Sequence, residues 1–129
     1  MFSSSIKDGV VVRIKNCWNK YLYIKNTGVV LADGSNISEA STFVLVKKGE
    51  NCFSLYCTNG HYISVTDDKR LICASTLPLK DETLEITVLH DNCVSLRSLK
   101  NHKFISIQKD FSIEVNRESA NEWEMFYLE

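Results

Sequence analysis

Short apolar runs alternate with polar residues through the last third of the chain. The runs lie at 94–96, 104–107, 111–115 and 123–128. Within them apolar and polar side chains follow one another with a period of two, as in Val94-Ser95-Leu96-Arg97. This alternation is typical of a half-buried β-strand, so the stretch predicts four short strands. The residues between the runs are polar and turn-prone and therefore mark the loops.

The same order of strands occurs two more times upstream. Phe53-Ser54-Leu55 corresponds to Val94-Ser95-Leu96, and the segment 61–65 corresponds to 103–107. Val12, Phe53 and Val94 follow one another at intervals of 41 positions. Self-similarity at a fixed period is the signature of a repeat architecture. It predicts a flexible leader at 1–9, followed by three repeats at 10–51, 52–92 and 93–129.

The three repeats predict one all-β domain over 10–129. Four short strands present a single apolar face, so no repeat has a core of its own. No segment sustains helical periodicity, and only short turns are expected at 36–41 and 117–122. A dozen strands in an open sheet would leave edges unprotected, whereas a closed barrel removes them. A propeller fits poorly, because it uses four to eight blades. The pattern therefore predicts a β-trefoil.

Four elements of the last unit resemble the repeat of fascin-like β-trefoils, a family that includes fascin, the hisactophilins and related actin-crosslinking domains. They are Val94-x-Leu96-Arg97-Ser98, Lys103-Phe104-Ile105-Ser106, Val115-Asn116-Arg117 and Trp123-Glu124-x-Phe126. The segment 59–65 matches the family's "NGKYLS" element with His in place of Lys. The resemblance covers about 10–129. It implies a β-trefoil and, more weakly, an actin-binding or membrane-associated cytoskeletal role.

Two departures limit what the resemblance implies. The chain has only three histidines, so the histidine-driven pH switching of a hisactophilin has little basis here. It also holds one trefoil where filament bundling requires two binding sites. Crosslinking would then need a dimer or two faces of one domain.

Composition and charge narrow the class of protein further. With 129 residues, 44% hydrophobic and 24% charged, the chain is an ordinary globular domain. A net charge of −1 argues against a nucleic-acid partner. The first residues contain no apolar secretory segment and no run is long enough to span a membrane. Five cysteines without an export signal predict free thiols and a cytoplasmic protein.

Basic side chains gather on and near the predicted first hairpin of each repeat. Lys20, His61 and Lys103 occupy equivalent positions, each directly before the aromatic residue of the second strand. We use the term basic cluster for these three residues together with Arg97, Lys100 and His102. Such a cluster is expected to bind an acidic surface, either F-actin or anionic lipid headgroups. The alternative interpretation is a solvated hairpin surface whose lysine stems cover the neighbouring rings.

Two tryptophans have different expected roles. Trp18 lies in a polar loop. We expect it to serve as a binding anchor or as a surface on which a sugar ring stacks. The alternative is a ring that folds over the mouth of the barrel. Trp123 aligns with Phe43 and Leu84, which predicts a core position. The cysteines and histidines lack the close pairs of a zinc site, so no metal is expected. No catalytic or cofactor-binding motif appears, so we expect neither an enzyme nor a cofactor.

Three functional hypotheses follow for this non-catalytic binding module. The first is a cytosolic fascin-like protein that binds F-actin through the basic cluster. The second is a carbohydrate-binding trefoil with Trp18 or Tyr23 stacked on a sugar, although a ricin-type Gln-x-Trp is absent. The third is a cytokine-like or scaffold trefoil that binds another protein.

Overall fold

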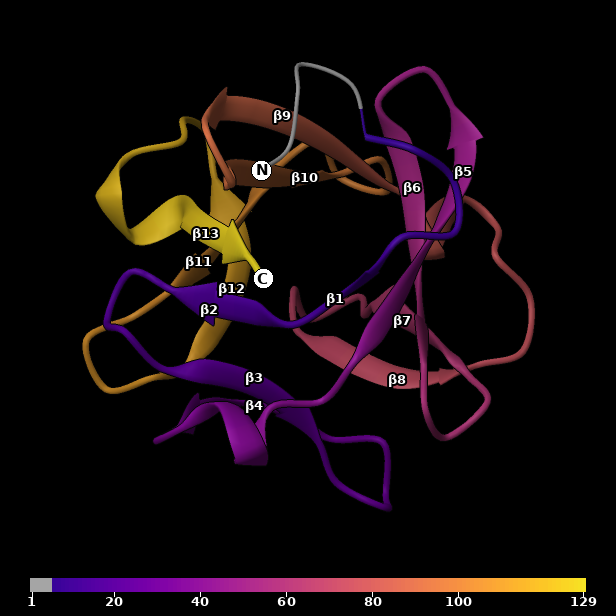
Figure 1. Ribbon diagram of the computed structural model, residues 1–129. Helices are drawn as coiled ribbons and strands as arrows, with labels where there is room; N and C mark the ends of the chain where they lie inside the picture. Colours follow the sequence, from indigo (N-terminus) through magenta and orange to yellow (C-terminus); the bar gives the residue numbers. More distant parts are fainter. Residues whose placement is uncertain (1–5) are drawn as a thin grey trace.

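A computed structural model describes residues 6–129 and consists of short strands with three single-turn 3-10 helices (Figure 1). Residues 10–51, unit one, contain β1 (Val11–Val12), β2 (Ile14–Asn16), β3 (Tyr21–Ile24), β4 (Val30–Gly34), η1 (Ile37–Glu39) and β5 (Phe43–Gly49). Residues 52–92, unit two, contain β6 (Cys52–Cys57), β7 (Tyr62–Val65), β8 (Leu71–Ser75), η2 (Lys80–Glu82) and β9 (Leu84–His90). Residues 93–129, unit three, contain β10 (Cys93–Ser98), β11 (Phe104–Ile107), β12 (Ile113–Arg117), η3 (Glu122–Glu124) and β13 (Met125–Leu128).

The first and fourth strands of the units form a closed antiparallel barrel. Hydrogen bonding runs in the order β1, β5, β6, β9, β10, β13 and β2. β1 and β2 are consecutive parts of one strand, so this path returns to its start. Arg13 lies between them and exchanges backbone hydrogen bonds of 2.7 and 2.8 Å with Glu129. Closure leaves no open edge in the barrel wall.

The second and third strands of each unit form a hairpin that covers one end of the barrel. These hairpins are β3–β4, β7–β8 and β11–β12. They bond to one another: the Cys73 N–H donates to the Gly28 carbonyl at 2.7 Å, and the Val115 N–H to the Lys69 carbonyl at 2.9 Å. Gly28 has φ +90°, and a Cβ there would lie 2.8 Å from the Cys73 oxygen, so the close approach requires glycine. A barrel with a three-hairpin cap is the architecture of a β-trefoil.

The core is built from the inward-facing residue of each alternating pair. In β5, Phe43 and Leu45 are fully buried, whereas Val44 between them faces outward. The other units place Phe53 and Phe126 in the same core. The all-β prediction with three repeats is therefore confirmed.

The leader differs from its prediction where it can be described. Ile6 is only 4% exposed and packs in the core. Gly9 donates its N–H to the Leu45 carbonyl at 2.8 Å, and Asp8 accepts the Lys47 N–H at 2.8 Å. The expectation of a flexible leader is thus wrong for residues 6–9, because an apolar side chain and two hydrogen bonds attach them to the barrel. Residues 1–5 of that leader lie outside the described residues.

Candidate functional site

The first hairpin turn of each unit places Lys20, His61 and Lys103 at equivalent positions. Their carbonyl oxygens accept hydrogen bonds from the N–H groups of Asn16, Cys57 and Ser98, each at 2.8 Å. The residue before each has a positive φ, in the left-handed region: Asn19 (63°), Gly60 (83°) and His102 (60°). His102 therefore serves as the turn residue of its hairpin.

An asparagine amide ties each of these turns to the third strand of its own unit. The amide nitrogens of Asn16, Asn59 and Asn101 donate to the carbonyls of Ala32, Cys73 and Val115 at 2.7, 3.1 and 2.9 Å. Sequence alignment missed this shared bond in unit one, because Asn16 stands two positions before the place of the other two asparagines. Each of these hydrogen bonds therefore fixes the position of the turn relative to the third strand of its unit.

The cations of unit three in the basic cluster are each paired with acidic side chains. Arg97 Nε lies 3.0 Å from Glu85 Oε1, and the Lys103 ammonium contacts the Glu118 carboxylate. No ion pair within residues 6–129 involves Lys20 or His61. The His61 ring nitrogen Nδ1 lies 3.1 Å from the carbonyl oxygen of Asn59 in its own turn. Three residues of the basic cluster, Arg97, Lys100 and Lys103, are therefore paired with acidic neighbours from units two and three.

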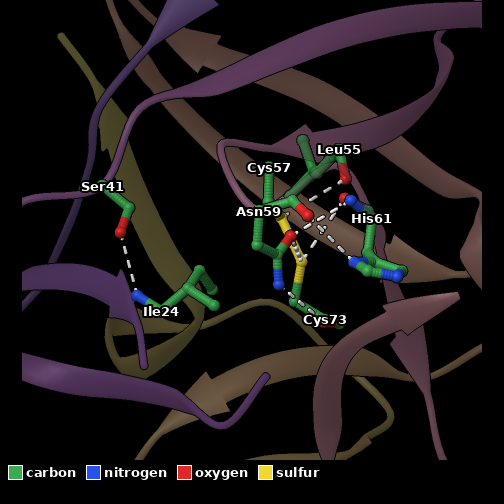
Figure 2. Close-up of a disulfide and its surroundings, with 7 residues drawn as sticks. All are labelled: Ile24, Ser41, Leu55, Cys57, Asn59, His61 and Cys73. Atoms are coloured by element: carbon green, nitrogen blue, oxygen red, sulfur yellow. Dashed lines mark hydrogen bonds between the residues drawn. A yellow bond between two sulfur atoms is a disulfide. The ribbon is translucent and has the colours of Figure 1, made fainter. Parts of the chain in front are cut away.

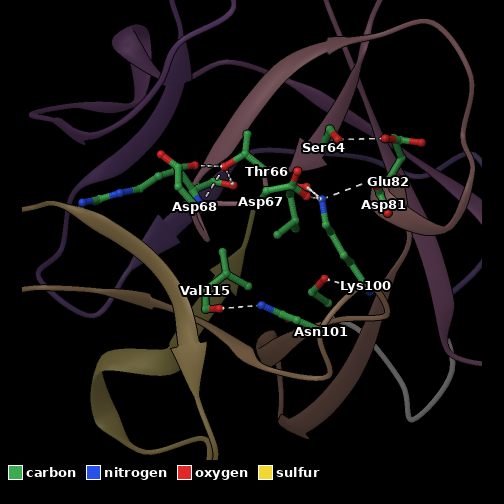
Figure 3. Close-up of polar contacts among 12 residues, drawn as sticks. Ser64, Thr66, Asp67, Asp68, Asp81, Glu82, Lys100, Asn101 and Val115 are labelled. Atoms are coloured by element: carbon green, nitrogen blue, oxygen red, sulfur yellow. Dashed lines mark hydrogen bonds and ion pairs between the residues drawn. The ribbon is translucent and has the colours of Figure 1, made fainter.

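Lys100 is held by three oxygens at the junction of units two and three (Figure 3). Its Nζ lies 2.7 Å from Asp67 Oδ1 and 3.3 Å from Asp81 Oδ2, and it donates to the Val65 carbonyl at 3.0 Å. The hydrogen bond with Asp67 raises the pKa of Lys100, and the same bond lowers the pKa of Asp67. We name the contact between Asp81 of η2 and Lys100 the ion-pair joint.

Trp18 is not a free anchor. Its ring is half-buried against the core, and the indole Nε1–H donates to the Ile107 carbonyl at 2.9 Å. Its own N–H donates to the Asn16 side chain at 2.9 Å. The ring thus folds onto the barrel, which was the alternative interpretation of this residue.

Trp123 occupies a surface position, so the prediction that it lies in the core is wrong. It is 36% exposed and belongs to η3, whereas Phe126 of β13 is fully buried. Matching by apolar character placed the strand three residues too early. Each 3-10 helix ends on a glutamate, Glu39, Glu82 or Glu124, and this glutamate finds the true register between units two and three. Aligned on it, Trp123 corresponds to Ser38 and Asp81.

The two tryptophans contact each other across the junction of units three and one. Their ring centroids are 5.5 Å apart with the planes tilted by 55°, an arrangement that aromatic pairs favour. This contact is the counterpart of the ion-pair joint, and we name it the tryptophan joint. Beside it lies a hollow of about 370 Å³, lined by Arg117, Asn121, Glu122, Trp123 and Glu124.

The glutamate that ends η3 forms the wall of this hollow. Glu124 is buried and accepts hydrogen bonds from the Ser106 hydroxyl at 2.6 Å and from the Asn121 N–H at 2.8 Å. Glu82 makes the equivalent bonds with Ser64 and the Leu79 N–H at 2.8 and 2.9 Å. The backbone of the hollow is therefore fixed by the same device that fixes η2.

The cysteines fall into two groups. Cys57 and Cys73 form a disulfide within unit two, where the sulfurs lie beneath Asn59 and His61 (Figure 2). The expectation of five free thiols is thus wrong for this pair, which the barrel brings together from β6 and β8. Cys17, Cys52 and Cys93 are free. Burial raises the pKa of the Cys17 thiol to about 11, so it is protonated at neutral pH.

Residues 6–129 contain no group of three or more His, Cys, Asp or Glu side chains placed to hold a metal ion. No helix formed by them is long and apolar enough to cross a bilayer.

The outer surface at the junction of units one and two carries an apolar row that its counterpart at the junction of units two and three lacks. Val11, Val44, Tyr56 and Tyr62 are successive cross-strand neighbours on β1, β5, β6 and β7. Directly paired residues lie on one face of a sheet, and Val11 and Tyr56 are 60% and 37% exposed. At the junction of units two and three the places of Val44 and Tyr56 are taken by the ion pair of Glu85 with Arg97.

Comparison with known proteins places this fold in a family. The family model described as Fascin domain matches residues 2–86, which is more than half of the chain. The chain therefore belongs to the Fascin domain family. Among solved structures it is similar to the designed threefold-symmetric protein ThreeFoil, with a TM-score of 0.73 and 12% identity over 92% of this chain and 96% of that one. None of the curated proteins matches the sequence.

These matches support the predicted β-trefoil and the fascin-like resemblance. The likeness to ThreeFoil shows the fold alone, because the identity is low.

Proposed function

We propose that this chain is a cytoplasmic, non-catalytic binding module whose partner is F-actin. The observation that carries the proposal is the match to the Fascin domain over residues 2–86. The rigid first hairpins support it, since they present side chains from a scaffold that does not need to rearrange on binding.

Two surfaces are candidates for the contact. The basic cluster is positively charged, but Arg97, Lys100 and Lys103 must leave their present acidic partners in order to pair with acidic side chains of a filament. Such an exchange gives selectivity and a faster encounter rather than a large gain in affinity. The apolar row carries the tyrosine rings that the basic cluster lacks, and exposed aromatic rings of this kind are enriched at protein contacts. Tyr56 and Tyr62 already hold each other in an edge-to-face arrangement with centroids 5.1 Å apart.

Cosedimentation with F-actin over a salt series tests the proposal. We expect the protein to pellet with filaments at low salt and to be released as ionic strength rises, because screening weakens charged contacts. If the protein stays in the supernatant even at low salt, it does not bind F-actin. Low-speed sedimentation then separates bundling from simple binding, since one trefoil bundles only with two filament sites.

Paired variants assign the surface. Lys100→Glu/Lys103→Glu reverses charge in the basic cluster, and Val11→Ser/Tyr56→Ser removes two side chains of the apolar row. Lys25→Glu/Lys109→Glu is a charge-matched control, because both lysines are exposed and lie outside the cluster. Loss of binding in the first variant alone assigns the basic cluster, and loss in the second alone assigns the apolar row. Vesicles containing anionic lipid, tested with the same variants, check the membrane alternative.

A further inference from the structure

The hollow beside Trp123 has features that the fold does not require. The equivalent positions in η1 and η2 carry Ser38 and Asp81, which are polar residues suited to a solvent-exposed turn. Trp123 is 36% exposed although tryptophan gains stability chiefly from burial. The turn that carries it is fixed by the hydrogen bond from the Asn121 N–H to the Glu124 carboxylate rather than by the ring. The ring at this position therefore stabilises the fold less than its size would suggest.

The ring is nevertheless held in one orientation. It packs on Trp18 with centroids 5.5 Å apart, and Trp18 is itself fixed by its hydrogen bond to the Ile107 carbonyl. The apolar surface of Trp123 thus faces the hollow in a preformed geometry, and little ordering remains when a ligand binds.

Polar side chains of complementary kinds surround this aromatic surface. The Arg117 guanidinium is oriented by a 2.9 Å hydrogen bond from its Nη2 to Gln108 Oε1, and its other N–H groups are donors. Asn121 supplies a donor and an acceptor, and Glu122 supplies acceptors. A hollow of about 370 Å³ lies within the usual range for small-molecule sites.

We propose that this hollow binds a saccharide whose ring stacks on Trp123. A pyranose presents an apolar C–H face, which suits the indole, and a rim of hydroxyls that both donate and accept. Arg117, Asn121 and Glu122 match that rim. The carboxylates of Glu122 and Glu124 disfavour an anionic ligand such as a phosphate. The site is independent of F-actin binding and goes beyond the proposed function.

Intrinsic fluorescence gives a direct test, because both tryptophans of the chain belong to this joint. The probes are the methyl glycosides of glucose, galactose, mannose and N-acetylglucosamine. We expect a saturable change in emission with at least one probe, with a Kd on the order of 1 mM. The same probe should shift the Trp123 indole N–H resonance in a proton–nitrogen correlation spectrum.

Two variants and a control complete the test. Trp123→Ala and Glu122→Ala should each weaken binding about tenfold or more, which corresponds to about 1.4 kcal/mol. The urea midpoint of each verifies that it folds. Leu79→Ala, another exposed apolar residue, should leave the titration unchanged. The proposal is overturned if no probe gives a saturable change at 100-fold the expected Kd, about 100 mM, or if Trp123→Ala binds the probe as tightly as the unaltered protein does, as followed in the proton–nitrogen correlation spectrum.

Discussion

The tryptophan joint and the ion-pair joint occupy equivalent places in the trefoil and use opposite chemistry. In one, Trp123 of η3 packs on Trp18 of the next hairpin. In the other, Asp81 of η2 lies 3.3 Å from Lys100 of the next hairpin. The backbone around both is the same: a buried glutamate caps the 3-10 helix and accepts a serine hydroxyl from the second strand.

The comparison separates what the fold requires from what it permits. The cap bonds satisfy part-buried backbone N–H groups, and an unsatisfied group there would cost free energy. Among the side chains that meet across the two joints, only Trp18 and Lys100 donate hydrogen bonds to the backbone, at the Ile107 and Val65 carbonyls. The backbone therefore does not constrain the residue on the helix side of each joint. That residue is Trp123 in η3 and Asp81 in η2.

The largest expected effect comes from the hairpin side of the tryptophan joint. Trp18→Ala removes a ring packed against the core and leaves the Ile107 carbonyl without its donor, so we expect a loss of about 3 kcal/mol in the free energy of unfolding. Urea unfolding followed by circular dichroism measures it. Trp18→Phe keeps most of the packing and should lose clearly less. Equal losses in the two variants would contradict the role assigned to the ring.

The next effect concerns the shared cap. Glu124→Ala leaves the buried Ser106 hydroxyl and the Asn121 N–H without acceptors, and we expect a loss of about 2 kcal/mol. Glu39→Ala is the matched control, because Glu39 caps η1 but is exposed, and its loss should be about 0.5 kcal/mol. Both are measured by urea unfolding. If Glu39→Ala is as damaging as Glu124→Ala, burial does not explain the difference.

Sequence reasoning was reliable where the fold repeats and failed where it does not. The 41-residue spacing identifies the three units, because each strand must alternate inward-facing core residues, such as Phe53 and Val94, with outward-facing residues. Trp123 was misplaced because a bulky apolar residue three positions before the first core residue of the strand, Phe126, resembles that core residue. The recurring glutamate would have corrected the register, but one charged residue carries little weight in a pattern of apolar runs.

The candidate site was less accessible to sequence than the fold. Lys100 and Lys103 are concentrated in unit three, but the acidic partners of Lys100 come from unit two, such as Asp67 in the turn after β7. No local pattern shows that these charges meet. The apolar row is likewise invisible along the chain, because Val11, Val44 and Tyr56 become neighbours only when β1, β5 and β6 pair.

Exchanging the helix side of the tryptophan joint should have a small effect on stability. Trp123→Asp places the residue of η2 into η3, and we expect the free energy of unfolding to change by no more than about 1 kcal/mol, because the position is exposed and its cap is retained. Urea unfolding measures the change. A loss as large as that of Trp18→Ala would mean that Trp123 is structural, and the hollow would then lose its claim to a separate role.

The smallest effect concerns Asp67, a second carboxylate that contacts Lys100 of the ion-pair joint. Lys100 lowers the pKa of Asp67, so this contact contributes stability above the ordinary carboxyl pKa of about 3.9 and loses it as pH falls through the lower folded-state value. The tryptophan contact itself has no such dependence, because neither ring titrates. A carbon-detected NMR titration of the Asp67 carboxyl should give a pKa below the ordinary value. In Lys100→Met that pKa should return toward it, and an unchanged value would show that Lys100 does not hold the carboxylate in solution. The indole N–H resonance of Trp18 should not follow the titration of Asp67, since the two joints lie at different junctions of the barrel.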